Sequence, residues 1–472
     1  MTLSAATTTQ QPDFAFPTKV ISKSLADLDK AIDTGNGKLI VRSLIDYDLA
    51  QCSIDPDSMK VVLDKIKAVT EQQSDPRTKA LLNTLLAGTY SAIYTSQRWI
   101  YDNRDIPAAP GNDYKLWSGQ QFRDTIISLT ESSLADADAL KSAPLKDYAS
   151  IILTGDHTCE FYPTLYDFVT LRAITTLKGL SYQNYMFSIN LLCHYDVYES
   201  MRFNYTSPVA AHILSLYRDA LEFHKHDAAP FIMYDIDRID FINDNLYTPG
   251  DSEDALKKKD ELLLDLYNRF SASPYSAEAL IAMGSGMPDS KMYDLITKRL
   301  AANPRYFNNG CLKNRLLSLT EKSLDAEYNN TVVPGDSLRI KVTNFNTRDY
   351  ELRLYRIPYV WKYGSSGYQI TKSTQLSAPV KTVRVTETDS IPFKKSDYAA
   401  AIQITQPGCY IIVPVISGQQ VETGRYYPAV HCTDLSIQTA AFNDNRWAYV
   451  TNPATGRPAT GQVKISVMNG NG

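Results

Sequence analysis

The sequence predicts an α+β protein with several domains: an all-α region of helical hairpins, an antiparallel β-sandwich, and the first strands of a second, incomplete sandwich. Three observations predict this architecture. Before residue 322, apolar residues recur at the spacing of one helix face, between start and stop signals for helices. After residue 322 the apolar period falls to two, and turn residues separate short strands without intervening helices. A length of 472 residues leaves room for about three domains, each with its own core.

Residues 1–19 are expected to form a flexible segment. They are polar, rich in Thr and Gln, and lack the basic and apolar regions of a secretory signal, so the protein is either cytoplasmic or has lost its leader. No apolar run approaches the ~18 residues that cross a bilayer, so no transmembrane segment is expected. The net charge of -4 supplies no basic field, and nucleic acid is not an expected partner. The six cysteines are scattered without a CxxC pair and predict neither a disulfide framework nor a zinc site.

Residues 20–321 are expected to be α-helical. Pro76 occupies a first-turn position, and an apolar stripe follows it. The positions of that stripe are Leu81, Leu82, Leu85, Leu86 and Tyr90. Ser118 and Gln121 have the spacing of a capping box at the start of another helix. Further helices are expected at about residues 20–33, 38–50, 57–72, 144–153, 163–178, 183–199, 208–225, 230–243, 254–271, 276–284, 290–302 and 309–320.

Short connections between these helices favour antiparallel neighbours, and many successive hairpins favour a solenoid over one compact bundle. Residues 273–319 contain two helical stripes separated by Pro, Asn and Gly, which resembles degenerate tetratricopeptide-type repeats without a strict repeat motif. An irregular helical domain is the alternative.

Residues 322–434 are expected to form the sandwich. Alternating or apolar segments, among them DSLRIKVTNFN and CYIIVPVIS, lie between turns such as Pro334-Gly335 and Pro407-Gly408. Residues 435–472 are expected to hold the first strands of a second, truncated domain. There, RWAYVTN precedes a turn punctuated by Gly456, Pro458 and Gly461, and residues 463–467 then alternate with period two. We expect these two segments to pair as a hairpin.

Three stretches resemble parts of bacterial alpha-2-macroglobulin-like proteins. Residues 161–174, FYPTLYDFVTLRAI, resemble a Pro-Thr-Leu-Tyr-Asp-Phe segment of the helical N-terminal region of that family. Residues 328–357 look like the fibronectin-like first macroglobulin domain, and residues 434–467, with a Thr-Gly-x-Pro turn, resemble the opening of the next. The resemblance spans about residues 100–472.

The resemblance implies a function without catalysis. Members of the family are large secreted or periplasmic proteins that trap proteases with a bait region and, in many members, a reactive Cys-Gln thioester. No cysteine here begins a Cys-x-x-Gln motif, so this chain forms no thioester. The implied interpretation is a non-enzymatic N-terminal piece of a protease-trapping inhibitor, periplasmic or at the cell surface, without cofactor. Its partners would be proteins: proteases through the full-length protein, and other domains of the same chain. The alternative is a cell-envelope module that binds a carbohydrate or a protein directly.

Candidate chemistry was weighed against packing. His224 and His226 lie two apart, on opposite sides of a helix, so a shared metal ion is not expected. The acids of DIDRID (Asp235, Asp237 and Asp240) are interpreted as a solvated helix face, because Ile236, Ile239 and Ile242 mark the core.

The FYPTLYDF segment is interpreted as helix packing, although Tyr166 and Arg172 could bind a ligand. An aromatic stretch of the sandwich predicts either an exposed binding surface or an inter-domain contact. Its aromatic residues are Tyr359, Trp361, Tyr363 and Tyr368.

Overall fold

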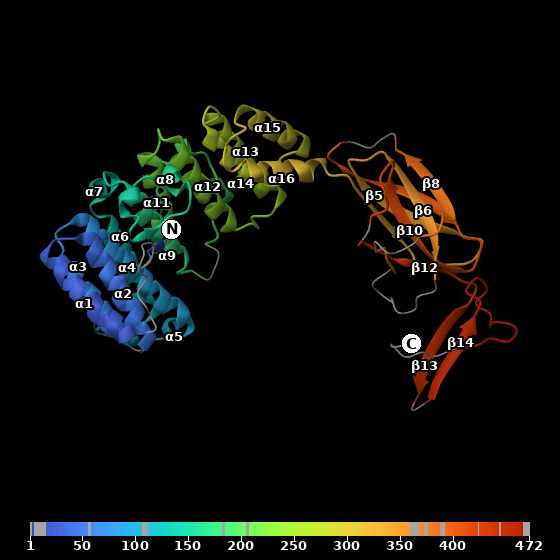
Figure 1. The fold of residues 1–472 in the computed structure, drawn as a ribbon, viewed down its shortest axis with the longest axis horizontal. Helices are drawn as coiled ribbons and strands as arrows, with labels where there is room; N and C mark the ends of the chain where they lie inside the picture. Colours follow the sequence, from blue (N-terminus) through green and yellow to red (C-terminus); the bar gives the residue numbers. More distant parts are fainter. Residues whose placement is uncertain are drawn as a thin grey trace. The chain divides into compact units, whose positions relative to one another are not determined.

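The computed structural model describes residues 2–3, 16–54, 58–105, 111, 113–181, 185–203, 207–358, 368–371, 376–387, 392–422, 424–442 and 445–465 (Figure 1). The chain is α+β, with a helical N-terminal part and a C-terminal β part. It forms two compact units, residues 1–287 with 299–309, and residues 288–298 with 310–472. None of the described helices is long and apolar enough to span a membrane.

The helices confirm most of the predicted segments. Those of the first half are α1 (Pro17–Asp33), α2 (Gly37–Ile54), α3 (Met59–Gln72), α4 (Pro76–Ser96), α5 (Arg98–Asp102), α6 (Gly119–Leu134), α7 (Ala137–Lys141), α8 (Thr158–Phe161) and α9 (Leu165–Lys178). They are followed by α10 (Tyr195–Tyr198), α11 (Pro208–Phe223), α12 (Ala228–Asp244), α13 (Glu253–Arg269), α14 (Ala277–Ala282), α15 (Asp289–Ala302) and α16 (Asn309–Thr320). The first helix begins at Pro17, inside the segment expected to be flexible.

Local start signals were read correctly. Pro76 is the first residue of α4, where Asp75 caps the helix by accepting a hydrogen bond from the Thr78 amide. Ser118 and Gln121 form the predicted capping box at α6. Four of the five predicted stripe residues of α4 are buried, Leu85 being the partly exposed one.

Two predicted helices are wrong, because contacts distant in sequence outweigh local periodicity. Residues 144–153 hold a single 3₁₀ turn, Leu145–Tyr148, and the strand β2 (Ile152–Leu153), which pairs with β1 (Thr2–Leu3). Pro144 forms a bridge with Thr164 instead of entering a helix. Within 183–199 the described residues contain the 3₁₀ turn Ile189–Leu191 and the short α10. There the Phe187 amide donates to the Asn245 carbonyl, 2.7 Å away, so its backbone pairs with the end of α12.

Neighbouring helices pack in pairs, among them α1 with α2, α4 with α6, α11 with α12 and α13 with α14. This arrangement is consistent with a helical-repeat-like region. Between α4 and α6, Phe122 lies at the centre of an aromatic cluster, all of whose members are buried. The rings around Phe122 are Tyr90, Tyr94, Tyr101, Tyr114 and Trp117.

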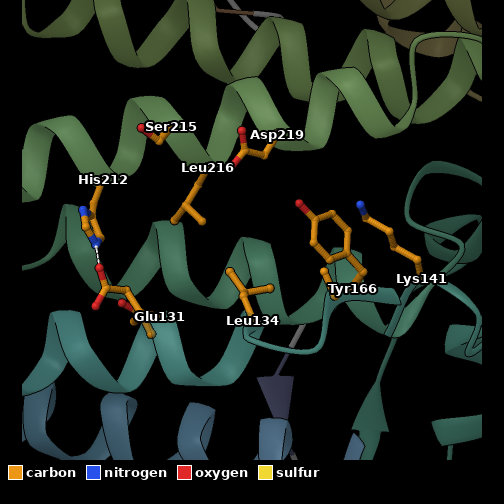
Figure 2. Close-up of a pocket in the computed structure, with 10 residues that line it drawn as sticks. Glu131, Leu134, Lys141, Tyr166, His212, Ser215, Leu216 and Asp219 are labelled. Carbon is orange, nitrogen blue, oxygen red and sulfur yellow. Dashed lines mark hydrogen bonds and ion pairs between the residues drawn. The ribbon is translucent and has the colours of Figure 1, made fainter. Parts of the chain in front are cut away.

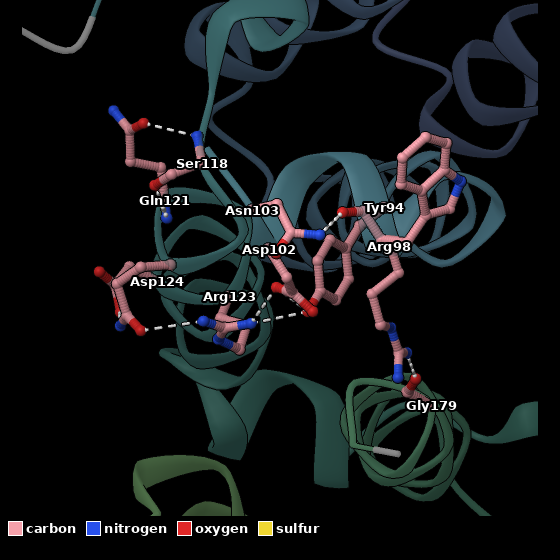
Figure 3. Close-up of polar contacts among 11 residues, drawn as sticks. Tyr94, Arg98, Asp102, Asn103, Ser118, Gln121, Arg123, Asp124 and Gly179 are labelled. Atoms are coloured by element: carbon pink, nitrogen blue, oxygen red, sulfur yellow. Dashed lines mark hydrogen bonds and ion pairs between the residues drawn. The ribbon is translucent and has the colours of Figure 1, made fainter. Parts of the chain in front are cut away.

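A polar network closes the edge of this cluster (Figure 3). Asp102 of α5 accepts hydrogen bonds from the Tyr94 hydroxyl (2.9 Å) and from Arg123 of α6 (2.8 Å). Arg98 lies over the ring of Tyr94 and donates to the carbonyl of Gly179, at the end of α9. The buried guanidinium of Arg98 thus has a hydrogen-bond partner, and the network joins α4, α5, α6 and the end of α9.

A single carboxylate fixes the connection between α14 and α15. Asp260 of α13 is buried, and its two oxygens accept hydrogen bonds from the amides of Gly284 (2.7 Å) and Gly286 (2.8 Å). A Cβ at Gly286 would overlap the backbone of Leu256, so this position requires glycine. The connection is thus held against α13 rather than lying free on the surface.

The β part contains two larger sheets and two short pairs. Its strands are β3 (Ser323–Tyr328), β4 (Thr331–Val332), β5 (Ser337–Phe345), β6 (Asp349–Ile357), β7 (Tyr368–Gln369), β8 (Lys381–Thr386), β9 (Lys395–Gln403), β10 (Gly408–Ile416), β11 (Tyr426–Tyr427), β12 (Ala429–Cys432), β13 (Ser436–Phe442) and β14 (Asn445–Thr451). One sheet has the order β4-β12-β10-β6-β8 and the other β3-β5-β9. Alternate residues of both sheets, such as Ile340 of β5, Leu352 of β6 and Ile412 of β10, share one core.

The end of α16 is joined to this β part through Asn346. The side-chain amide of Asn346 donates to the carbonyls of Leu319 (2.7 Å) and Glu321 (3.1 Å). Its side-chain oxygen accepts from the Phe393 amide at 2.8 Å. Asn346 has φ 55°, a left-handed conformation that Asn tolerates better than most residues. One side chain therefore satisfies carbonyls that the helix end leaves unpaired.

The C-terminal hairpin is not the predicted one. β14 pairs with β13, over a register from Ser436–Thr451 to Phe442–Asn445. The expected turn forms, with Asn452 accepting from the amides of Ala454 and Thr455, but it places only Pro458 and Ala459 beside β14. Residues 462–465 belong to no strand. β14 pairs instead with β13, because only two residues separate these two strands in the sequence.

Candidate functional site

The FYPTLYDF segment contains a buried carboxylate that joins three helices. Thr164 caps α9, and Asp167 completes a capping box by accepting from the Thr164 amide (2.9 Å) and hydroxyl (2.7 Å). The other oxygen of Asp167 accepts from His224 Nε2, at the end of α11 (2.7 Å), and from the Tyr234 hydroxyl of α12 (3.1 Å). Asp167 is 0 % exposed and His224 1 %.

This Asp–His pair has the composition of a catalytic dyad but is closed to substrate. The second ring nitrogen of His224 faces Asp227 at 3.3 Å, so carboxylates contact both nitrogens. Burial raises the pKa of Tyr234 well above its usual value, with the Asp167 charge as a further cause, and keeps its hydroxyl neutral as a donor. A general base must reach the proton that it removes, and His224 has no exposed atom surface to do so.

His224 and His226 lie in different environments, as their spacing of two residues predicts. His224 is directed into the Asp167 network, whereas His226 is exposed. Within the described residues, no three His, Cys, Asp or Glu side chains are grouped as a metal site would require.

The acids of DIDRID do not form the solvated face that we expected from the sequence. Asp235 is buried and paired at 2.7 Å with Arg238, whose guanidinium is itself buried and lies over the ring of Tyr198. Asp237 accepts from the Tyr217 hydroxyl (2.6 Å) and from Lys178 (3.0 Å). The expectation fails at Asp235, because an acid three residues before an arginine can enter the core as a pair.

Tyr166 of the same segment borders an open cleft, which we call the α6–α11 cleft (Figure 2). The cavity of about 450 Å³ lies between α6, α7, α9 and α11. Its lining residues are Thr130, Glu131, Leu134, Ala137, Lys141, Tyr166, His212, Ser215, Leu216 and Asp219. Lys141 lies 5.0 Å above the ring of Tyr166 and 4.8 Å above that of Phe223. Burial raises the pKa of the Tyr166 hydroxyl, which therefore remains neutral.

Serine, histidine and glutamate side chains all line this cleft, a combination that sequence spacing alone does not reveal. His212 Nε2 lies 2.6 Å from Glu131 Oε1, although 81 residues separate them. Figure 2 shows Ser215 one turn further along α11, and the described contacts include no hydrogen bond from Ser215 to His212. Without contact between nucleophile and base, the arrangement lacks the first requirement of a hydrolytic triad. The cleft presents paired charges and an aromatic wall, which suit binding.

Of the four aromatic residues predicted to form a binding surface or an inter-domain contact, the structure describes Tyr368. Tyr368 lies in β7, paired with Tyr427 of β11 and half-buried against a small apolar core that includes Ile370 and Ile411. Tyr359, Trp361 and Tyr363 lie outside the described residues.

The β13–β14 hairpin exposes large side chains. Trp447 is 67 % exposed and Tyr449 52 % exposed. Both lie on one face, because they alternate along β14, and Ile437 is exposed on the other. A two-stranded sheet with apolar side chains in water is marginally stable by itself.

Comparisons with known proteins show no family for this chain. No protein-family model and no curated protein matches it. Among solved structures, it matches the Pseudomonas fluorescens alkylpurine DNA glycosylase AlkC bound to DNA containing an abasic site analog, at 11 % sequence identity over 88 % of this chain and 97 % of that chain. The TM-score is 0.16, which is too low to support a common fold or a shared activity.

Proposed function

We propose that this chain is a non-catalytic scaffold and interaction region of an alpha-2-macroglobulin-like, protease-trapping protein of the cell envelope. The observation that carries the proposal is the Asp167 network. One of the three segments that resemble the family contributes Asp167, which with His224 forms a buried pair that joins three helices through hydrogen bonds. Such a role is that of a structural joint.

Two further features support the proposal. The inward residues of the two larger sheets share one core, as a macroglobulin-type sandwich requires. The exposed Trp447 and Tyr449 suit a hairpin that another surface covers, as in the opening of a second sandwich domain. On this proposal the helical part, of tetratricopeptide-like type, and the sandwich make contacts with other domains and with proteins.

The first test is the reading frame beyond Gly472. The proposal expects further sandwich domains, with a bait region and, if the thioester is used, a Cys-x-x-Gln motif. A stop codon or an unrelated domain would contradict it.

The second test is biochemical. This chain is titrated against trypsin-like and elastase-like proteases, with a large protein and a small peptide as substrates. We expect both hydrolysis rates to stay unchanged, because a trap needs a cleavable bait and an enclosing shell. Protection of the large substrate alone, at a stoichiometric ratio, would show that the chain is itself an inhibitor.

A further inference from the structure

A second cleft in the helical unit has aromatic walls and mixed polar groups, and we call it the aromatic cleft. Its volume is about 440 Å³, within the range of about 300–1,000 Å³ that small-molecule sites occupy. Its lining residues are His157, Glu160, Pro274, Tyr275, Ala302, Asn303, Pro304, Arg305, Tyr306 and Phe307. They come from the start of α8, the 3₁₀ turn Pro274–Ser276 and the segment after α15.

Two of the aromatic rings stack face to face, which leaves part of the Phe307 ring exposed toward the cleft. The rings of His157 and Phe307 are stacked with centroids 3.9 Å apart and an interplanar angle of 7°. Phe307 is nevertheless 45 % exposed. Tyr275 and Tyr306 meet edge to face at 6.0 Å, and Phe161 supports both Tyr275 and Phe307 from within the core. The exposed apolar surface is therefore rigidly backed.

A carboxylate next to the stacked rings is held in one orientation. Glu160 accepts from His157 Nδ1 at 2.8 Å through one oxygen and from the Tyr275 hydroxyl at 2.6 Å through the other. These hydrogen bonds, the one from Tyr275 first, lower the pKa of Glu160, so it is ionised. Glu160 keeps free lone pairs toward the cleft, since each carboxylate oxygen can accept twice.

The backbone at His157 is strained in a way that places its ring. His157 has φ 62° and ψ -1°, the left-handed conformation, directly before α8. This conformation is unfavourable for a non-glycine residue, and strained residues cluster at ligand sites. In this conformation the imidazole of His157 both stacks on Phe307 and forms a hydrogen bond with Glu160, and these two contacts offset the strain.

From this geometry we propose that the aromatic cleft binds a saccharide. A sugar ring presents C–H groups on its faces, which pack on aromatic rings, and hydroxyls at its rim, which both donate and accept. The cleft offers Phe307 as a stacking surface, Glu160 as an acceptor, and Arg305 and Asn303 as donors. Arg305 is exposed, and no hydrogen bond or ion pair to it is found among the described residues.

Other occupants fit this cleft less well. A wholly apolar ligand would take the exposed Arg305 guanidinium out of water without giving it a partner. A lysine or arginine side chain of a protein would meet Arg305 as a like charge. This inference goes beyond the proposed function and does not depend on it.

The experiment uses saturation-transfer NMR followed by calorimetry on the full chain. The probes are methyl glycosides of glucose, galactose, mannose and N-acetylglucosamine, together with their β-1,4 disaccharides. We expect at least one probe to bind at millimolar concentration. Arg305→Ala and Phe307→Ala should each weaken that binding roughly tenfold, the effect of losing one charge-assisted hydrogen bond or a stacking surface.

Tyr247→Ala is the matched control, because this tyrosine is 74 % exposed and lies outside the cleft. It should leave the affinity unchanged. Arg305 is exposed, so its variant tests the site even if Phe307→Ala lowers the melting temperature. The inference is overturned if no saccharide binds, or if binding survives both cleft variants. Binding of Nα-acetyl-arginine amide in place of sugars would also overturn it and would assign a protein side chain to the cleft.

Discussion

Removing the carboxylate of Asp167 gives the sharpest test of the joint between α9, α11 and α12. Asp167→Ala deletes the acceptor for Thr164, His224 and Tyr234 at once. His224 and Tyr234 are buried, so neither group can turn to solvent. Each buried donor that loses its acceptor costs about 1–3 kcal/mol, so His224 and Tyr234 together should cost about 3–5 kcal/mol. At ~2–4 °C per kcal/mol for larger domains, the helical unit should melt roughly 6–20 °C lower.

The assay is urea denaturation followed by far-UV circular dichroism, with a calorimetric melt beside it. Tyr234→Phe alone should cost about 1 kcal/mol, because it removes one donor and leaves no buried oxygen behind. The double variant should cost less than the sum of the two single variants, since both changes break the same hydrogen bond. Asp64→Asn is the control. Asp64 is half-exposed and paired only within its helix to Lys60, and its loss should stay below about 0.5 kcal/mol.

An unfolding free energy of Asp167→Ala within about 0.5 kcal/mol of the native value would refute this reasoning. It would mean that the Asp167 network is incidental to stability. The dyad would then again be a candidate for chemistry.

Three further predictions follow from the structure. Asn346→Ala should destabilise the β part by about 1 kcal/mol more than Asn346→Gly does. Both variants lose the hydrogen bonds to α16, but only alanine is strained at φ 55°. Equal losses of unfolding free energy in calorimetry would contradict this. Deleting residues 435–472 should leave the melting of the two-sheet core within a few degrees, because among the described strands neither β13 nor β14 pairs with a strand of the two larger sheets. Collapse of the β signal would assign the hairpin to that core. The free energy of unfolding should fall as the pH rises from about 10 toward about 12. Burial raises the pKa of Tyr90 to about 12 in the folded state, above an unfolded value of about 10, so the stability contributed by its neutral hydroxyl is complete below pH 10 and is lost as the pH rises to 12. Tyr90→Phe should make the urea midpoint fall less steeply with pH, and an unchanged dependence would rule this out.

The sequence allowed correct predictions where the signal was local. Proline at a first turn and the capping box at Ser118 act within one helical turn, so their pattern alone places the starts of α4 and α6. The switch from helices to strands was also readable, because both periodicities are local: α16 ends at Thr320 and β3 begins at Ser323.

The site residues were not readable in the same way. Asp167 and His224 are 57 residues apart, and the contact between them depends on how α9 packs against α11. The aromatic cleft joins Glu160 to Tyr275, 115 residues away. Residues 183–199 failed for a related reason, since Phe187 pairs with a strand-like segment after α12 that periodicity does not reveal. In each case the deciding contact is tertiary, and a single sequence contains no direct record of it.

The two hydrogen bonds that Asp260 accepts from glycine amides limit changes of length in the segment between α14 and α15. Two N–H groups, two residues apart, must reach the two oxygens of one carboxylate. An inserted or deleted residue between Gly284 and Gly286 would therefore leave at least one buried oxygen of Asp260 without a hydrogen bond. The turn at Gly418 has open space around it and tolerates a change of length. In a set of natural variants, we therefore expect insertions and deletions to accumulate near Gly418 and to be absent from residues 283–287. The spacing of these two amides would then be retained even where the surrounding side chains diverge.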